Sequence, residues 1–198
     1  MNSNYIINNL INALQKMPTI GQRTAKRIAL SMLQNKDGLI KPLVETLNEV
    51  YNKVNKCKVC GNFTSGDICD ICSNAKRDTK TICVVESVSD LWAIENTGIF
   101  NGIYHILDGT LSAIEGRGEE VLKIENLKKR IKENNVEEVI IATNPTLDGQ
   151  TTAFYIVSHL EEFNVKITQP ALGVPMGSEL NYLDDNTLNV AFKNKRDF

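Results

Sequence analysis

The sequence predicts an α/β protein with four successive parts: a helical N-terminal region, a small four-cysteine knuckle, a mostly parallel sheet flanked by helices, and a short C-terminal strand or tail. Three observations predict it. Two helical stretches flank a Pro–Gly turn at the start, and four cysteines fall within sixteen residues. From residue 81 onward, apolar runs of strand length alternate with helical segments. The 198 residues allow one large domain or two to three small ones.

The N-terminal region is expected to be helical. Apolar residues recur at helical spacing from Ile6 to Leu14, and Pro18 ends that helix. Gly21 opens a second helix, whose first backbone N–H groups are free to hold a phosphate. A third helix is expected over residues 39–54, with an apolar face that belongs to a core.

The turn before the second helix is basic. Residues 16–27 contain Lys16, Arg23, Lys26 and Arg27 and no acidic residue. This composition favours binding of phosphates over the alternative, a plain helical hairpin with a solvated basic face. Residues 1–53 carry seven Lys/Arg against three Asp/Glu, whereas residues 81–198 carry ten against eighteen. The difference hints at an anionic partner for the N-terminal part, although ordinary variation in surface charge would explain it equally well.

The four cysteines follow the pattern C-x2-C-x8-C-x2-C, formed by Cys57, Cys60, Cys69 and Cys72. Two close pairs separated by a short loop suit tetrahedral binding of one structural Zn²⁺. The alternative is two disulfides. The chain begins without the basic and apolar regions of a signal peptide, so we expect a cytoplasmic protein with reduced thiols. No apolar run approaches the roughly 20 residues needed to cross a membrane, so no membrane association is expected.

Strands and helices alternate after the knuckle, which indicates a mostly parallel sheet covered on both faces. Cys83 and His105 lie within apolar strands and are expected to be core residues. A final strand is expected over residues 187–192. The other expected strands are residues 81–86, 102–107, 138–143 and 165–168, and the expected helices are residues 87–95, 121–135 and 151–163.

Ligands of such sheets meet the loops at the carboxyl ends of the strands. Here these loops begin at Glu86, Asp108 and Asn144. The last of them, A-T-N-P-T-L-D-G-Q over residues 142–150, resembles the Toprim fold of topoisomerases and primases, whose acids hold magnesium. Glu86 matches the first Toprim glutamate, but Asn144 and Thr146 fall where two aspartates belong. Because Mg²⁺ needs anionic oxygen ligands, we expect no two-metal cleavage centre.

The basic turn resembles the helix-hairpin-helix motif, L-P-G-I-G-x-x-x-A, which grips the DNA backbone without reading bases. The chain has M-P-T-I-G-Q-R-T-A over residues 17–25, so Thr19 replaces the first glycine and Gly21 keeps the second. The tail adds G-V-P-x-G-x-E-L-x-Y-x-D-x-x-T-L over residues 173–188. The order of hairpin, cysteine knuckle, degenerate Toprim sheet and this tail resembles the RecR family of bacterial recombination mediators.

The resemblance implies a non-enzymatic role in recombinational DNA repair. Members form ring-like tetramers, bind DNA and act with RecO, and in many bacteria RecF, to load RecA at single-stranded gaps. DNA contacts of the family fall on Arg23 and Arg27, at the helix opened by Gly21; charge alone adds Lys26. The chain departs from the family at Gln150, where an acid is usual, and at Gln169, which stands in place of a common arginine.

The resulting domain prediction assigns residues 1–53 to a helix-hairpin-helix region, 54–79 to a four-cysteine zinc finger, 80–175 to a Toprim domain and 176–198 to a tail used in oligomerisation. The predicted partners are DNA, RecO, RecF and further copies of the chain, as a dimer or tetrameric ring near the nucleoid. Glu86, Asn144 and Asp148 are candidate contacts for a basic partner. Two alternatives remain: a Mg²⁺-dependent nuclease or primase using Glu86 and Asp148, and a zinc-stabilised adaptor that never touches DNA.

Overall fold

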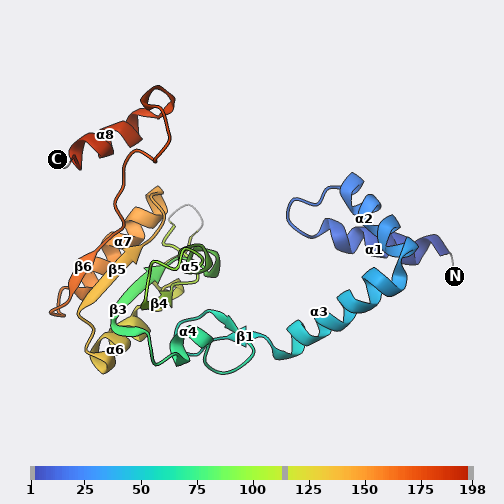
Figure 1. The fold of residues 1–198 in the computed structure, drawn as a ribbon, viewed down its shortest axis with the longest axis horizontal. Coiled ribbons are helices and arrows are strands. Elements are labelled where there is room, and N and C mark those ends of the chain that lie inside the picture. The colour runs from blue at the N-terminus through green and yellow to red at the C-terminus, as the bar shows by residue number, and fades with distance from the viewer. Residues whose placement is uncertain (1–2, 113–115, 196–198) are drawn as a thin grey trace. The chain divides into compact units, whose positions relative to one another are not determined.

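The computed structural model describes residues 3–112 and 116–195. The chain divides into two compact units, Met1–Val54 and Asn55–Phe198 (Figure 1). Within the described residues, no helix combines the length and the apolar character that a bilayer crossing requires. The predicted division into four domains stays a prediction.

The first unit consists of helices. α1 (Ser3–Gln15) and α2 (Gln22–Gln34) form the hairpin, and a π-helical turn, η1 (Lys36–Ile40), leads into α3 (Lys41–Lys53). Its small core contains the buried side chains of Leu14, Ala25 and Ala29. The expectation that the apolar face of the third helix belongs to a core is wrong for the single chain, because every residue of α3 is exposed.

The cysteine knuckle begins the second unit and packs against its sheet. β1 (Asn55–Lys56) pairs antiparallel with β2 (Phe63–Thr64), and a short helix, α4 (Asp70–Ser73), follows. Ile71 of α4 packs both on the cysteines and on a core cluster of the sheet. The knuckle and the sheet therefore share one compact unit.

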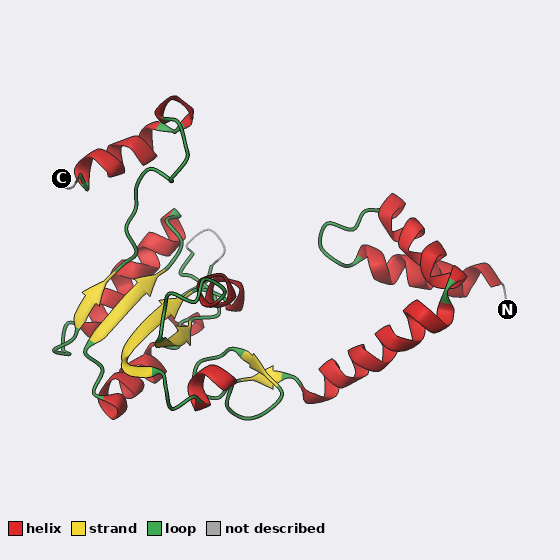
Figure 2. Ribbon diagram, in the orientation of Figure 1, coloured by secondary structure: helices red, strands yellow, loops and turns green. Residues whose placement is uncertain are grey.

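The sheet of the second unit has four parallel strands in the order β4-β3-β5-β6 (Figure 2). Val85 at the end of β3 lies beside both Ile106 of β4 and Ala142 of β5, so the carboxyl ends of three strands meet at one edge. The parallel α/β fold is thus confirmed. The strands are β3 (Asp78–Val85), β4 (Gly102–Ile106), β5 (Glu138–Ala142) and β6 (Lys166–Thr168).

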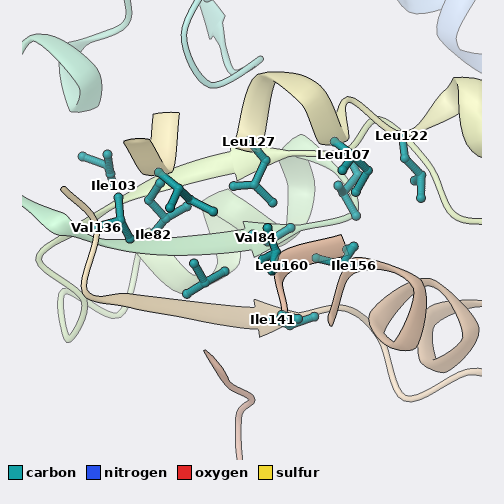
Figure 3. Close-up of a cluster of buried hydrophobic side chains, with 13 residues drawn as sticks. Ile82, Val84, Ile103, Leu107, Leu122, Leu127, Val136, Ile141, Ile156 and Leu160 are labelled. Atoms are coloured by element: carbon teal, nitrogen blue, oxygen red, sulfur yellow. The ribbon is translucent and has the colours of Figure 1, made fainter. Parts of the chain in front are cut away.

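Helices cover both faces of this sheet. Alternate residues of β3 explain why: Ile82 and Val84 enter the larger core cluster (Figure 3), whereas Cys83 and Val85 enter the other. Cys83 and His105 are buried, as expected. The helices of this part are α5 (Val88–Glu95), the 3-10 turn η2 (Glu119–Val121), α6 (Ile124–Asn134) and α7 (Leu147–Leu160).

Two element predictions are corrected. α7 begins four residues before the predicted start, because the Thr146 hydroxyl caps it by accepting a hydrogen bond from the Gly149 backbone N–H. The strand predicted over residues 187–192 is wrong: after the 3-10 turn η3 (Leu180–Tyr182), the chain forms helix α8 (Asp185–Lys193). Asp184 caps α8 by accepting from the Thr187 N–H at 3.0 Å, and this local helix-start signal explains why the segment is helical.

Candidate metal centre and nucleic-acid interface

The four cysteine sulfurs of the knuckle converge on one point. Their Sγ atoms all lie within 4.8 Å of one another, and those of Cys60 and Cys69 are 3.5 Å apart. A tetrahedron of thiolates around zinc places the sulfurs about 3.8 Å apart, given a Zn–S bond of about 2.3 Å. All four cysteines are free thiols, so the alternative of two disulfides is wrong. A donor set of four sulfurs with this spacing fits one Zn²⁺ and leaves no ligand position open.

Burial and shared hydrogen bonds shift the pKa values of three of the cysteines in different directions. The pKa of Cys60 is lowered to about 5, chiefly by a hydrogen bond from Cys72 and despite burial. The pKa of Cys69 is raised to about 11, chiefly by burial, and that of Cys72 is raised by the hydrogen bond that it shares with Cys60. The thiols thus share protons with one another, and a divalent ion would displace these protons on binding, because cysteines ligate metals as thiolates.

Local backbone geometry holds the cysteines in place. Backbone N–H groups of the knuckle point at two sulfurs: that of Asn62 at Cys60 Sγ, at 3.4 Å, and that of Cys69 at Cys57 Sγ, at 3.3 Å. Gly61 has a φ of 88°, a left-handed conformation that favours glycine and turns the chain after the first cysteine pair. Such N–H···S contacts stabilise thiolates, as a structural metal centre requires.

The predicted DNA-contacting side chains lie together at the start of α2. Arg23, Lys26 and Arg27 are exposed, and their spacing of three and four residues places them on one helix face. Within the described ranges, none of them forms an ion pair with a carboxylate. A cluster of unpaired cations on one face is suited to binding a polyanion.

The N-terminus of α2 is also open to an anion. Its N-cap is Gly21, so no side chain caps the first N–H groups of the helix, and space around the glycine Cα is open. Thr19, two residues earlier, has a φ of 65°. This is the left-handed region, which a β-branched residue rarely occupies, so the departure from glycine at this position strains the turn.

At the carboxyl edge of the sheet, Glu86 is bound by Asn144. The Asn144 backbone N–H donates to Glu86 Oε1 at 2.7 Å, and its side-chain amide donates to Glu86 Oε2 at 2.6 Å. Gly149 fits tightly beside this pair: a Cβ there would lie 2.1 Å from the Asn144 carbonyl oxygen and 2.7 Å from Glu86 Oε1. Both carboxylate oxygens of Glu86 therefore accept hydrogen bonds from neutral N–H groups of Asn144. In a Toprim enzyme these oxygens would face a metal.

Asp148, the second predicted acid of this edge, lies near a cation. Its carboxylate lies 4.0 Å from Arg117 Nη2. Among the described residues, the four cysteines are the only group of three or more Cys, His, Asp or Glu side chains placed to share one ion. The structure thus brings Glu86 and Asn144 together and leaves Asp148 outside their hydrogen bonds.

Sequence reasoning missed two ion-pair networks of the second unit. Asp108, two residues after the end of β4, accepts from Lys56 of β1 at 2.7 Å and also binds Lys123, so it ties the knuckle to the sheet. Arg77 pairs with Glu95 and donates to two carbonyl groups beside β4. Only the position of Asp108 at a strand end signalled a role in the sequence, because ion pairs between distant residues leave no local pattern.

Comparisons with known proteins assign each part of the chain to a family. The family model for the RecR helix-hairpin-helix matches residues 7–51, and the model for the RecR zinc finger domain with four cysteines matches residues 54–74. The Toprim domain model matches residues 80–171, and the RecR C-terminal model matches residues 173–196. Together with the sulfur geometry, the second match confirms the prediction of one zinc ion bound by four cysteines.

Relatives named "Recombination protein RecR" align with nearly the whole chain. The one from Cereibacter sphaeroides (strain ATCC 17025 / ATH 2.4.3) is 45% identical over 192 residues, covering 97% of this chain and 96% of the relative. The one from Rhizobium etli (strain CIAT 652) is 48% identical over 187 residues, covering 94% and 93%. The one from Orientia tsutsugamushi (strain Ikeda) is 47% identical over 189 residues, covering 95% and 93%.

Proposed function

Because the chain belongs to the RecR family of recombination proteins, we propose that it is a DNA-binding mediator of recombinational repair that catalyses no reaction itself. In this role it binds the DNA backbone without reading sequence. It acts with RecO, and with RecF as a further candidate partner, to help load RecA at single-stranded gaps. The observation that carries the proposal is the group of unpaired cations at the uncapped start of α2.

The chemistry of the hairpin supports backbone binding. The side chains of Arg23, Lys26 and Arg27 neutralise phosphates, and the free N–H groups after Gly21 donate to phosphate oxygens. Contacts of this kind carry no base information, and their strength falls as salt rises, because bound DNA releases counterions. One hairpin provides few such contacts, so a single copy would bind weakly.

Several copies acting together would overcome this weakness, and we propose that the chain assembles as a dimer or a tetrameric ring. Apolar side chains of α3 are exposed, including Leu43, Leu47 and Val50, as is Phe192 of α8. An open cavity of about 680 Å³ beside α7 and β6 has Phe154 among its lining residues. Large exposed apolar surfaces of this kind mark sites of association, and linked hairpins gain avidity on one DNA strand.

The side chains at the carboxyl edge of the sheet support the proposal that the protein catalyses no reaction. A two-metal centre requires several carboxylates that share each ion, but Glu86 is occupied by the amide groups of Asn144. Asp148 is the other acid near this loop, and its neighbour is the cation of Arg117. We propose that Glu86, Asn144 and Asp148 instead form a polar contact surface for a basic partner such as RecO. The substitution Glu86→Lys should then weaken RecO binding at least about tenfold, and unchanged binding would exclude this surface.

The DNA-binding proposal is tested by titrating full-length protein into fluorescent single-stranded and gapped DNA at low salt. Arg23→Ala combined with Arg27→Ala should lower affinity about tenfold or more, and should reduce the slope of log affinity against log salt by about 1.5. The matched control is Lys36→Ala combined with Lys41→Ala, which removes two exposed cations of the same unit outside the hairpin. The control should change affinity less than about threefold.

Two outcomes would overturn the proposal. Equal losses in both double variants would mean that total charge, and not the hairpin, binds DNA; no loss in either would favour the adaptor that never touches DNA. The enzyme alternative is tested by incubating the wild-type protein with labelled DNA, nucleotides and Mg²⁺ or Mn²⁺. Cleavage or synthesis that disappears in Glu86→Gln would establish it.

A further inference from the structure

Arg130 of α6 is a buried cation without an acidic partner. Its side chain is only 6% exposed, and no carboxylate of the described chain forms an ion pair with it. Its Nη1 donates to the Tyr104 carbonyl oxygen at 2.7 Å, but Nε and Nη2 have no hydrogen-bond acceptor among the described residues. Because a guanidinium stays protonated in proteins, the sheet encloses a positive charge that needs compensation.

Arg130 gains no compensating charge from its neighbour His105. Its Nη1 also lies 3.3 Å from His105 Nδ1, which accepts because arginine has no lone pair to offer. Burial, followed by the charge of Arg130, lowers the pKa of His105 to about 3, so this imidazole is neutral. Two further charges act on His105, those of Lys123 and Asp108. These two side chains form an ion pair with each other.

The cysteine knuckle lies at the same strand edge as Arg130. β4 is an edge strand of the sheet, and its free edge offers the Tyr104 carbonyl group to Arg130 and the Ile106 N–H to the Cys60 carbonyl oxygen, at 2.9 Å. These two strand residues are two positions apart, so their backbone groups point the same way. Burial lowers the pKa of Arg130, and the four cysteines are the groups whose charges raise it.

We propose that Arg130 is the buried counter-ion of the four-cysteine metal centre, held in position by the outer edge of β4. Four thiolates around Zn²⁺ carry a net charge of −2, which is costly in a buried site unless cations or N–H donors surround it. Arg130 supplies a positive charge from a helix that follows the knuckle by more than fifty residues. It positions and stabilises the centre without binding the metal, and it couples metal binding to docking of the knuckle on the sheet.

The test compares charge with hydrogen bonding at this one position in the full-length protein. Arg130→Lys keeps the charge, whereas Arg130→Gln keeps an N–H donor for the Tyr104 carbonyl and removes the charge. Lys129→Gln is the matched control, because it removes a cation from the exposed face of the same helix. Zinc affinity is measured by competition with a colorimetric chelator, with metal content checked by mass spectrometry.

We expect Arg130→Gln to weaken zinc binding about 10- to 100-fold and Arg130→Lys to retain most of the affinity, with Lys129→Gln unchanged. If Arg130→Gln binds zinc as tightly as Arg130→Lys, the proposal is wrong. Should Arg130→Gln fail to fold, zinc release from Arg130→Lys decides the matter: a rate within about threefold of wild type supports a charge effect, and a faster rate contradicts it.

A second measurement separates this role from a purely structural one. Thermal unfolding of wild type and Arg130→Gln is compared with zinc bound and after removal by a chelator. With zinc, Arg130→Gln should unfold at the lower temperature. Without zinc, the difference should vanish or reverse, because the buried guanidinium has lost its counter-charge. An equal decrease in both conditions would mean that Arg130 only supports the sheet.

Discussion

The two compact units differ in how many of their apolar side chains they bury. The first, Met1–Val54, buries only Leu14, Ala25 and Ala29 in the described part of its core and leaves α3 exposed along its whole length. The second, Asn55–Phe198, has two core clusters on opposite faces of its sheet and a metal-binding knuckle attached to the edge strand. Stability is therefore concentrated in the second unit.

The two units also differ in how far their charged side chains are paired. In the first, Arg23, Lys26 and Arg27 have no acidic partner in the described chain, and the helix that carries them has no side-chain cap. In the second, Asp108 holds two lysines, and the Asp90 and Ser87 side chains form a capping box at α5. Groups without an internal partner therefore mark the surface available for ligands, whereas internally paired charges belong to the scaffold.

The largest expected effect comes from removing a metal ligand of the second unit. Cys60→Ser should abolish stoichiometric zinc binding and lower the free energy of unfolding of this unit by at least about 3 kcal/mol. Trp92 is the single tryptophan and donates its indole N–H to Asn62 of the knuckle at 3.3 Å, so its fluorescence reports the change. The control Cys83→Ala should keep one zinc per chain. Wild-type stability in zinc-free Cys60→Ser would show that the metal does not stabilise the second unit.

The next effect concerns the hydrogen bonds between Asn144 and Glu86 at the carboxyl edge of the sheet. Asn144→Asp places a carboxylate oxygen where the amide now donates to Glu86, and should cost about 2 kcal/mol of unfolding free energy through repulsion and a lost hydrogen bond. Mg²⁺ should recover part of this loss in the variant and leave the unfolding temperature of the wild type unchanged. Asn126→Asp, an exposed control, should change stability by less than about 0.5 kcal/mol.

A smaller effect is expected for the ion pairs of Asp108. Burial alone would raise the pKa of Asp108, but hydrogen bonds from Lys123 and Lys56 outweigh burial, and the net pKa is lowered. The stabilisation is therefore complete above the ordinary aspartate pKa of about 4 and disappears as the pH falls through the lower pKa of the folded state. Asp108→Asn should cost about 1 kcal/mol at neutral pH and nothing at the acid end.

The control for Asp108 is Asp67→Asn, because Asp67 pairs with Lys58 where both side chains are more than two-thirds exposed. It should have little effect at any pH. Denaturant unfolding followed by Trp92 fluorescence, from neutral pH down to about pH 3, measures both variants. If Asp108→Asn lowers the free energy of unfolding equally at every pH, packing of Asp108 and not its charge stabilises the protein.

The smallest effect tests strain in the first unit. Thr19→Gly removes a β-branched residue from a left-handed conformation. The relief of strain exceeds the backbone entropy that glycine loses on folding, so the variant should stabilise the hairpin by about 0.5–1 kcal/mol. Thr24→Gly, inside α2, should destabilise it by about 1 kcal/mol. Thermal unfolding followed by far-ultraviolet circular dichroism compares them. The same sign in both would mean that position 19 carries no strain.

Much of the fold could be predicted because its signals are local. The cysteine spacing, the strand-length apolar runs and the Pro–Gly turn each depend on residues that are close in sequence. The error at α8 arose because the strand prediction over residues 187–192 overlooked a helix-start signal, the Asp184 side chain that accepts from the Thr187 backbone N–H. The helix of residues 41–53 was predicted from its apolar pattern, but the burial expected for that face is absent from the single chain.

The zinc ligands, the parallel α/β architecture and the basic turn could all be read from the amino-acid sequence, because chelation by close cysteine pairs and strand periodicity act over a few residues. Three features emerged from the folded chain alone: Asn144 hydrogen-bonds to Glu86, Asp108 joins the knuckle to the sheet, and Arg130 lies buried beside β4. Each of these contacts joins residues that are far apart in the sequence. Such contacts depend on strand register and on how helices pack over the sheet, which no short stretch of sequence records.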